Sequence, residues 1–176
     1  MIRDMIPTLI KLVDETRSLG IRIIWIQQTT LPGGCSDYPA WLYCKTRDGK
    51  RPDYVTKGTW GHEFVDGLRP LNGETVMQKF RFSAFTKTPL DLLLQASDIK
   101  TVIIAGVVTQ GCVEATTRDA SYHDYFTVVI EDCVASTSRD LHEASLKYMA
   151  SRYDILTSVE LLSLWKGIIC VSSRGG

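Results

Sequence analysis

Three short apolar runs constrain the fold of this chain more than any other feature of its sequence. Residues 21–27 (IRIIWIQ), 101–105 (TVIIA) and 126–130 (FTVVI) are predicted strands, and the first is almost continuously apolar. Such a run is typical of a strand that is covered on both faces of a parallel sheet. Because helical patterns alternate with these strands, the sequence predicts an α/β fold with a mostly parallel sheet and right-handed crossovers.

Helix signals lie between and after the strands. Apolar residues recur at mostly helical spacing over 5–19, and Gly20 follows as a C-cap residue. Thr88 and Pro89 provide the N-cap and first-turn proline of a helix that extends to about residue 97. Further helices are expected over 112–122, after Ser138 and from a capping box at 157–160, and further strands over 74–79 and 155–156. In the helix after Ser138, one stripe is expected to comprise Leu141, Ala144, Ser145, Tyr148 and Met149.

Composition narrows the possible partners. The 176 residues are 44% hydrophobic, with 20 basic and 20 acidic side chains scattered along the chain, which favours a single domain over 1–176. Neither a nucleic-acid footprint nor a polybasic membrane patch is present in this pattern. No apolar run reaches the ~20 residues of a membrane span, and the first residues lack a signal-peptide pattern, so a cytoplasmic location is expected. A small molecule is the expected ligand.

The cysteines and one long segment are candidates for function. The chain has five cysteines, an odd number, and no C-x-x-C pair, so reduced thiols are expected rather than a disulfide framework or zinc cluster. Residues 29–71 are rich in glycine, proline and polar residues, which indicates irregular structure. A loop of this length in a compact domain is usually functional, so this segment is predicted to form a lid or a pocket wall.

Lys79 and Cys112 follow two neighbouring predicted strands. Lys79 ends the strand at 74–79, and the turn at 106–111 leads from the next strand to Cys112 at the start of a helix. Ligands bind at the carboxyl edge of such a sheet. A helix N-terminus and a nearby ammonium both favour a thiolate, so the pair is predicted to form an activated nucleophile. The alternative is that Cys112 is inert core packing and Lys79 a solvated edge residue.

Several motifs in order carry a resemblance to a known family. Residues 79–85 (KFRFSAF) are similar to K-x-R-[YF]-S-A-F, and 58–61 read GTWG. Residues 106–109 (GVVT) precede 112–116 (CVEAT) and 118–120 (RDA). Over nearly its whole length the chain resembles the isochorismatase-like cysteine hydrolases, which include nicotinamidases, N-carbamoylsarcosine amidases and ureidoacrylate or biuret amidohydrolases. The resemblance implies a Rossmann-like three-layer sandwich.

The resemblance also implies a chemistry. A Cys-Lys-Asp triad would hydrolyse a carbon–nitrogen bond, with Cys112 attacking the amide carbonyl to form a thioester and Lys79 beside it. The Val107–Val108 peptide bond would be cis, and the backbone N–H groups of Val108 and Cys112 would form the oxyanion hole. The cysteine favours the amide-cleaving branch, because the true isochorismatases lack it.

The same family resemblance bears on cofactors, on assembly and on the third member of the triad. His62, His123 and His142 do not form the Asp-x-His pattern with which nicotinamidases hold a metal, so no metal and no cofactor are expected. A homo-oligomer, either a dimer or a tetramer, is expected. The family's first strand carries the triad aspartate in a D-x-Q motif, and this chain begins at the following helix, so its domain is N-terminally short. Asp4 is not assigned the catalytic role; truncation, a substitute acid and a missing base are the alternatives.

Pocket walls are predicted by position around the motifs. Trp60, Arg81, Phe82 and Phe85 are candidates, with core packing as the alternative for the two phenylalanines. Arg81 either binds a substrate carboxylate or pairs with a structural acid. Structural roles are expected of Arg118, Asp119 and Asp132.

The predicted function is that of a small amidohydrolase acting on a linear amide, carbamoyl or ureido compound. One alternative is a non-catalytic member of the family that lacks the triad aspartate. A weaker alternative is a thiol-redox protein, although no resolving cysteine lies close to Cys112 in sequence.

Overall fold

The computed structural model describes residues 1–47, 49 and 51–172, with only the backbone of 168–172. Its helices are α1 (Ile2–Ser18), α2 (Pro39–Thr46), α3 (Leu90–Ala96), α4 (Glu114–Tyr122), α5 (Arg139–Ala150) and α6 (Ser158–Ser172). Its strands are β1 (Ile24–Gln28), β2 (Thr75–Lys79), β3 (Thr101–Val107), β4 (Phe126–Ala135) and β5 (Asp154–Leu156). The alternation of helices and strands is confirmed, and α1 begins earlier than the periodicity predicted.

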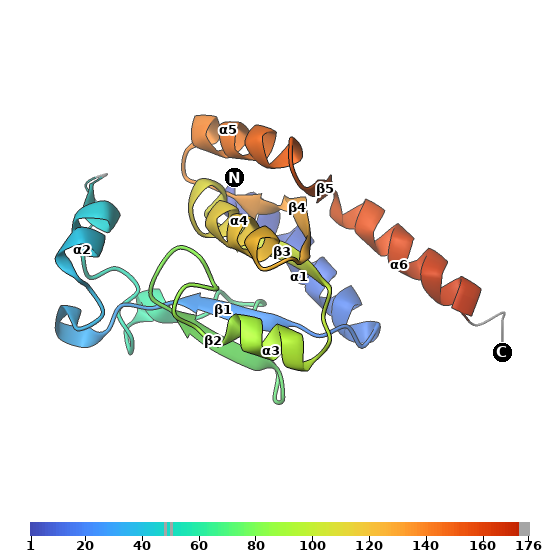
Figure 1. Ribbon diagram of the computed structural model, residues 1–176, viewed down its shortest axis with the longest axis horizontal. Helices are drawn as coiled ribbons and strands as arrows, with labels where there is room; N and C mark the ends of the chain where they lie inside the picture. Colours follow the sequence, from blue (N-terminus) through green and yellow to red (C-terminus); the bar gives the residue numbers. More distant parts are fainter. Residues whose placement is uncertain (48, 50, 173–176) are drawn as a thin grey trace.

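The described strands form two sheets in which every pairing is parallel. β1 pairs with β2, and the other sheet has the order β3-β4-β5. Figure 1 shows the pair β1 and β2 with α3 along its lower side, and the other sheet beside α4 and α5 above it. The predicted α/β class and parallel pairing are therefore confirmed.

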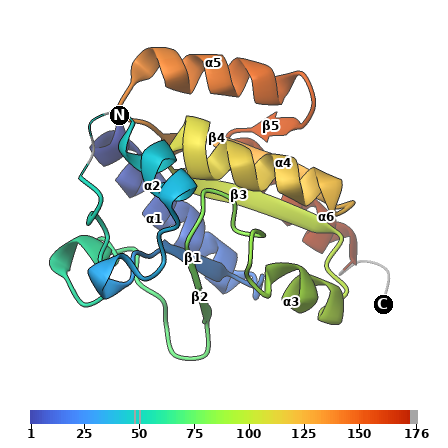
Figure 2. The same cartoon turned by 60° about the vertical axis from the view of Figure 1, so that its left-hand side comes forward.

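Helices cover both faces of the larger sheet. Along β4, Val128 and Ile130 pack with Leu12 of α1 and with Leu161 and Leu162 of α6. The intervening Val129 turns to the other face. There it packs with Val134 of the same strand, with Val113 of the turn before α4 and with Met149 of α5. Figure 2 shows the three layers that this alternation produces.

The continuous burial predicted for 21–27 is not found in β1. All five residues of β1 are only partly buried, and along β3 alternate residues are exposed, including Ile103 at 37% and Val107 at 43%. Both strands have one hydrogen-bonded neighbour within the described part of the chain. A strand with one paired edge keeps part of its surface open, which explains the difference.

A third cluster of buried residues joins the two sheets. Met77 of β2, Leu94 of α3 and Ala120 of α4 pack together, with Val102 of β3 against them. This contact brings the carboxyl ends of β2 and β3 to the same side of the molecule, which is where the sequence places its candidate nucleophile.

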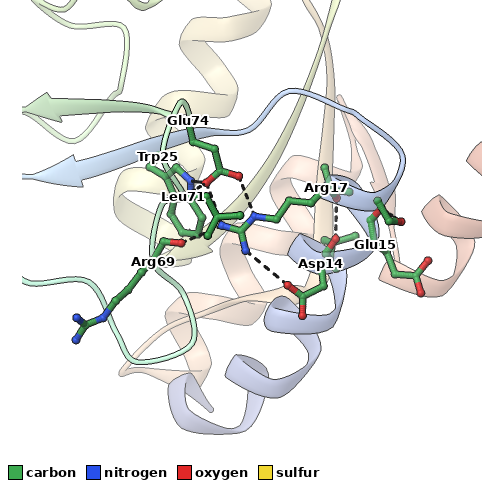
Figure 3. A network of polar contacts seen from close by, with 10 residues as sticks. Asp14, Glu15, Arg17, Trp25, Arg69, Leu71 and Glu74 are labelled. Atoms are coloured by element: carbon green, nitrogen blue, oxygen red, sulfur yellow. Dashed lines mark hydrogen bonds and ion pairs between the residues drawn. The ribbon is translucent and has the colours of Figure 1, made fainter.

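A polar network, drawn in Figure 3, ties the end of α1 to the start of β2. Arg17 donates from Nε to Oε1 of Glu74 at 2.8 Å and from Nη2 to Oε2 at 3.0 Å. Trp25 Nε1 and the backbone N–H of Leu71 donate to the same carboxylate, at 2.7 and 2.8 Å. The Arg17 hydrogen bonds are the main reason that the pKa of Glu74 is lowered to about 2.

Two predictions about the chain's local structure need correction. Residues 29–71 are not wholly irregular, because α2 forms within them, with Pro39 at its first position where a missing N–H costs nothing. In α5, the predicted stripe is only partly buried: Ser145 and Met149 are buried, whereas Leu141 is 52% exposed. The helix lies over the turn before α4 rather than deep in the core, so a narrower face is covered.

Candidate active site

Lys79 and Cys112 lie in contact. The Nζ atom of Lys79, the last residue of β2, is 3.0 Å from the Sγ atom of Cys112, which follows β3. Lys79 also donates to Oε1 of Gln28 at 2.7 Å and to the backbone carbonyl of Arg81 at 2.9 Å. These three contacts fix the position of an ammonium group that is almost wholly buried.

Burial and the neighbouring thiol act on Lys79 in opposite directions. Desolvation lowers the pKa of the Lys79 ammonium, while its Coulomb interaction and hydrogen bond with Cys112 raise it, and the net direction is downward. A lysine with a lowered pKa can exchange a proton near neutral pH more readily than an exposed one.

Cys112 lies on a π-helical turn, Thr109–Val113, that connects β3 with α4. We call it the nucleophile turn. The helix predicted from about Cys112 to Tyr122 is present, and its α-helical part, α4, begins two residues later at Glu114. The backbone N–H groups of Gly111 and Val113 both donate to the carbonyl of Val108, at 3.1 and 3.3 Å, which closes the wider loop.

The backbone before this turn has two special features. Gly106 has a φ of 121°, which only glycine adopts readily, so a side chain at this position is excluded on conformational grounds. The Val107–Val108 peptide bond is cis, at the position that the resemblance indicates. The oxyanion hole assigned to the N–H groups of Val108 and Cys112 stays a prediction.

Two of the predicted substrate-binding residues lie away from this pair. Trp60 is 89% exposed on a short 3-10 turn. Phe85 is buried in the core, and its ring stacks on His123 with centroids 4.9 Å apart. His123 directly follows α4. Core packing, the alternative that the sequence left open for Phe85, describes its surroundings.

Arg81 joins the motif after β2 to the lid segment, which we define as residues 29–71. Its Nη1 atom donates to the carbonyl of Ser36 at 3.1 Å and to that of Phe80 at 2.6 Å. The guanidinium lies over the ring of Trp41 at 4.9 Å, and Trp41 packs edge-on against Phe82. Ser36 and Trp41 of the lid segment therefore lie against the residues that follow Lys79, and a role of the segment as a lid or pocket wall stays a prediction. In the part of the chain that the structure describes, no carboxylate forms an ion pair with Arg81.

Other contacts in the site could not be predicted from the sequence. Gln28 and Trp41 contact Lys79 and Arg81 only because β1 and α2 are brought there by the fold. Within the lid segment, the side chains of Lys45 and Asp37 form an ion pair and are 1% and 6% exposed. Lys45 also donates to Oγ1 of Thr30 at 3.3 Å. This pair secures α2 to the end of β1.

The carboxylates singled out in the sequence have structural partners. Asp132 accepts hydrogen bonds from the backbone N–H of Ser158 at 2.8 Å and from its hydroxyl at 2.7 Å, which holds the start of α6. Asp4 pairs with the amino group of Met1. Within the described residues, no carboxylate forms an ion pair with Lys79.

The three histidines are held by separate partners. His62 Nε2 lies 2.9 Å from the hydroxyl of Thr29, and burial lowers the pKa of this imidazole. His142 Nδ1 lies 2.8 Å from Oγ1 of Thr109, and His123 lies 3.4 Å from a carboxylate oxygen of Asp91. In the part of the chain that the structure describes, no group of three or more His, Cys, Asp or Glu residues could hold a metal ion.

Comparison with known proteins identifies the family. A model of the isochorismatase domain matches residues 1–160, so the chain belongs to the isochorismatase family. The chain is 34% identical to a ureidoacrylate amidohydrolase RutB of Methylorubrum extorquens over 138 residues, which cover 73% of this chain and 56% of that protein. It is 35% identical to a ureidoacrylate amidohydrolase RutB of Cronobacter turicensis over 134 residues, covering 68% and 56%. The chain thus spans a little over half the length of these relatives.

Solved structures share the fold. An isochorismatase-like hydrolase from Alkaliphilus metalliredigens superposes with a TM-score of 0.83 and 29% identity, covering 93% of this chain and 86% of that one. The N-carbamoylsarcosine amidase from Thermoplasma acidophilum does so with a TM-score of 0.73 and 26% identity, covering 89% and 84%. The predicted resemblance to the amidase branch is confirmed. None of the described helices combines the length and the apolar character that crossing a membrane requires.

Proposed function

We propose that this chain is a cysteine-dependent amidohydrolase that cleaves a non-peptide carbon–nitrogen bond in a small linear amide, carbamoyl or ureido compound. The observation that carries the proposal is the 3.0 Å contact between the buried Nζ of Lys79 and Sγ of Cys112. Membership of the isochorismatase family and similarity to ureidoacrylate amidohydrolases and an N-carbamoylsarcosine amidase support the reaction class.

The first half of the proposed reaction forms a thioester. Lys79, whose pKa is lowered by burial, accepts the thiol proton of Cys112. The thiolate attacks the substrate carbonyl carbon, and the backbone N–H groups of Val108 and Cys112 stabilise the oxyanion. As the carbon–nitrogen bond breaks, the Lys79 ammonium donates its proton to the leaving nitrogen. Ammonia or an amine departs, and the acyl group stays on sulfur.

The second half releases the acid. Lys79, now neutral, accepts a proton from water while the water oxygen attacks the thioester carbonyl. The carbon–sulfur bond breaks, the carboxylic acid leaves, and the Lys79 ammonium returns its proton to the sulfur of Cys112. The sum is amide plus water giving acid plus amine. Gln28 supports both steps, because its carbonyl oxygen holds Nζ of Lys79 at 2.7 Å.

Arg81 and the lid segment are the proposed binding side of the site. Lys79 donates to the backbone carbonyl of Arg81, and the guanidinium of Arg81 lies over the ring of Trp41. A carboxylate on the substrate would accept hydrogen bonds from this guanidinium. Trp60 lies on the same lid segment. Its contact with substrate stays a prediction, and its exposure does not support that prediction.

A second candidate function is a non-catalytic member of the family. It is favoured by one observation: within the described residues, the polar partners of Lys79 are Gln28, Arg81 and Cys112, and none is a carboxylate.

A single domain over 1–176, assembly as a dimer or tetramer and a cytoplasmic location also stay predictions.

The test is ammonia release from a panel of linear amides, carbamoyl compounds and ureido acids. Cys112→Ala and Lys79→Met are the site variants, and Lys100→Met, which alters an exposed lysine, is the matched control. We expect release by the wild-type chain and by Lys100→Met, and none above background by Cys112→Ala. Release that persists in Cys112→Ala would contradict the proposal, and a folded wild-type chain that is silent on the whole panel would favour the non-catalytic candidate.

A further inference from the structure

The nucleophile turn is held from its outer side by α5. Thr109, its first residue, is 0% exposed. A buried hydroxyl needs a hydrogen-bond partner, because an unsatisfied one costs about 1–3 kcal/mol. Its partner is Nδ1 of His142, 2.8 Å away and 33 positions later in the chain. The turn that carries Cys112 is thus bonded to α5.

A second contact is made by Ser145, three residues after His142 on α5. Ser145 is buried and donates to Oε2 of Glu114 at 2.6 Å, and its oxygen lies 3.4 Å from the carbonyl of Thr109. Glu114 follows the nucleophile turn directly as the first residue of α4. His142 and Ser145 therefore hold the two ends of the five-residue turn between them.

The other carboxylate oxygen of Glu114, Oε1, is linked to the end of α5 through Arg118. Arg118 Nη2 donates to Oε1 of Glu114 at 2.6 Å, and Nη1 donates to the hydroxyl of Tyr148 at 2.6 Å. The guanidinium also lies 4.4 Å from the centre of the Tyr148 ring. His142, Ser145 and Tyr148 are spaced three residues apart, so they share one face of α5. This face is bonded to the nucleophile turn and to α4 at three successive points.

We propose that His142 is a positioning residue for the nucleophile turn, acting through the Thr109 hydroxyl, with Ser145 securing the other end of the turn through Glu114. The proposal rests on the proposed function for its kinetic effect. Cys112 lies on this short turn with its own N–H group, and Val108, whose N–H group is also expected to stabilise the oxyanion, directly precedes the turn. A displacement of about 1 Å in such a group can cost about 10²-fold in rate. A loosened turn would lower kcat and leave the Arg81 and lid contacts, hence KM, unchanged.

The test combines two readouts on four variants. His142→Phe keeps a ring of similar size and removes the hydrogen bond, and His142→Asn can place an amide atom near the position of Nδ1. Thr109→Val removes the other partner with little change of shape. Glu143→Gln, on the exposed face of α5, is the matched control. The readouts are kcat and KM for ammonia release, and the rate at which iodoacetamide alkylates Cys112, with Tm measured to compare folding.

We expect His142→Phe to lower kcat at least about tenfold with KM within about twofold, and to slow the alkylation of Cys112. His142→Asn should recover most of both losses, and Glu143→Gln should match the wild-type chain. In the Thr109→Val background, His142→Phe should cause no further loss, because both act through one hydrogen bond.

Two results would overturn the proposal: unchanged kcat and alkylation in His142→Phe, or a loss of equal size with and without the Thr109 hydroxyl. A wild-type chain that releases no ammonia, while the variants still change the alkylation of Cys112 in this pattern, would refute the proposed function and leave the positioning role standing. If His142→Phe does not fold, the same comparison of kcat, KM and alkylation rate is made with His142→Asn and Thr109→Val.

Discussion

Replacing Glu74 by Gln should destabilise the protein near neutral pH by about 2 kcal/mol. Its pKa is lowered from 4.5 to about 2, and each pKa unit corresponds to about 1.4 kcal/mol, which sets an upper limit of about 3.4 kcal/mol. Arg17 and Glu74 are 20% and 17% exposed, so solvent screening reduces this value to about 2 kcal/mol. Glutamine keeps the shape of the side chain but loses the charge that Arg17 faces.

The sign of the pH dependence follows from the direction of the shift. Because the folded pKa of Glu74 lies below its unfolded value, its stabilising effect is complete above about pH 5 and is lost as pH falls toward about 2. The assay is thermal unfolding of the wild-type chain and Glu74→Gln at pH 7 and at pH 3. At pH 7 we expect the variant's Tm to be about 4–8 °C lower, and at pH 3 the difference should be clearly smaller.

A surface pair provides the control for this reasoning. Asp98 pairs with Lys100, and both side chains are highly exposed, so Asp98→Asn should leave the Tm unchanged at either pH. A Tm difference for Glu74→Gln that is the same at pH 7 and pH 3 would refute the electrostatic account. A change as small as that of Asp98→Asn would show that the network in Figure 3 does not stabilise the fold.

Three further predictions concern buried charges and thiols. Lys79→Met should remove the rapid reaction of Cys112 with iodoacetamide near neutral pH, and an unchanged rate would mean that the ammonium does not activate the thiol. Lys45→Met should lower the free energy of unfolding by about 3–5 kcal/mol, because it leaves the buried carboxylate of Asp37 without its ion-pair partner. Denaturant unfolding measures this change, and a loss of less than about 1 kcal/mol would contradict the prediction. Burial raises the pKa of Cys133 to about 12, so this thiol should resist alkylation until the protein unfolds, and labelling as fast as that of exposed Cys44 would oppose its buried placement.

Much of the fold could be predicted because its signals are local. The run at 101–105 and the apolar positions of α1 each report on their own element through spacing. The start of α4 and the whole of α2 were harder. A short helix such as Pro39–Thr46 has a weak periodic signal, and its packing against Phe82 and Arg81 supports it instead.

The candidate site divides in the same way. Lys79 and Cys112 could be singled out because parallel strands bring their carboxyl ends to one edge, and the motifs around them are distinctive. Phe85 could not be assigned from sequence, since an aromatic residue next to a motif serves a pocket or a core equally well. Its stacking on His123 depends on where α4 ends relative to the segment after β2.

By itself the sequence determined the class of fold, the order of the strands along the chain and the residue types available at the carboxyl edge, because periodicity and turn chemistry act over neighbouring residues. Only the tertiary structure decided which side chains meet. Gln28 reaches Lys79 across 51 positions, and His142 reaches Thr109 across 33. Such contacts form when whole helices and strands pack, and a buried ammonium or hydroxyl then requires a partner from whichever element lies against it.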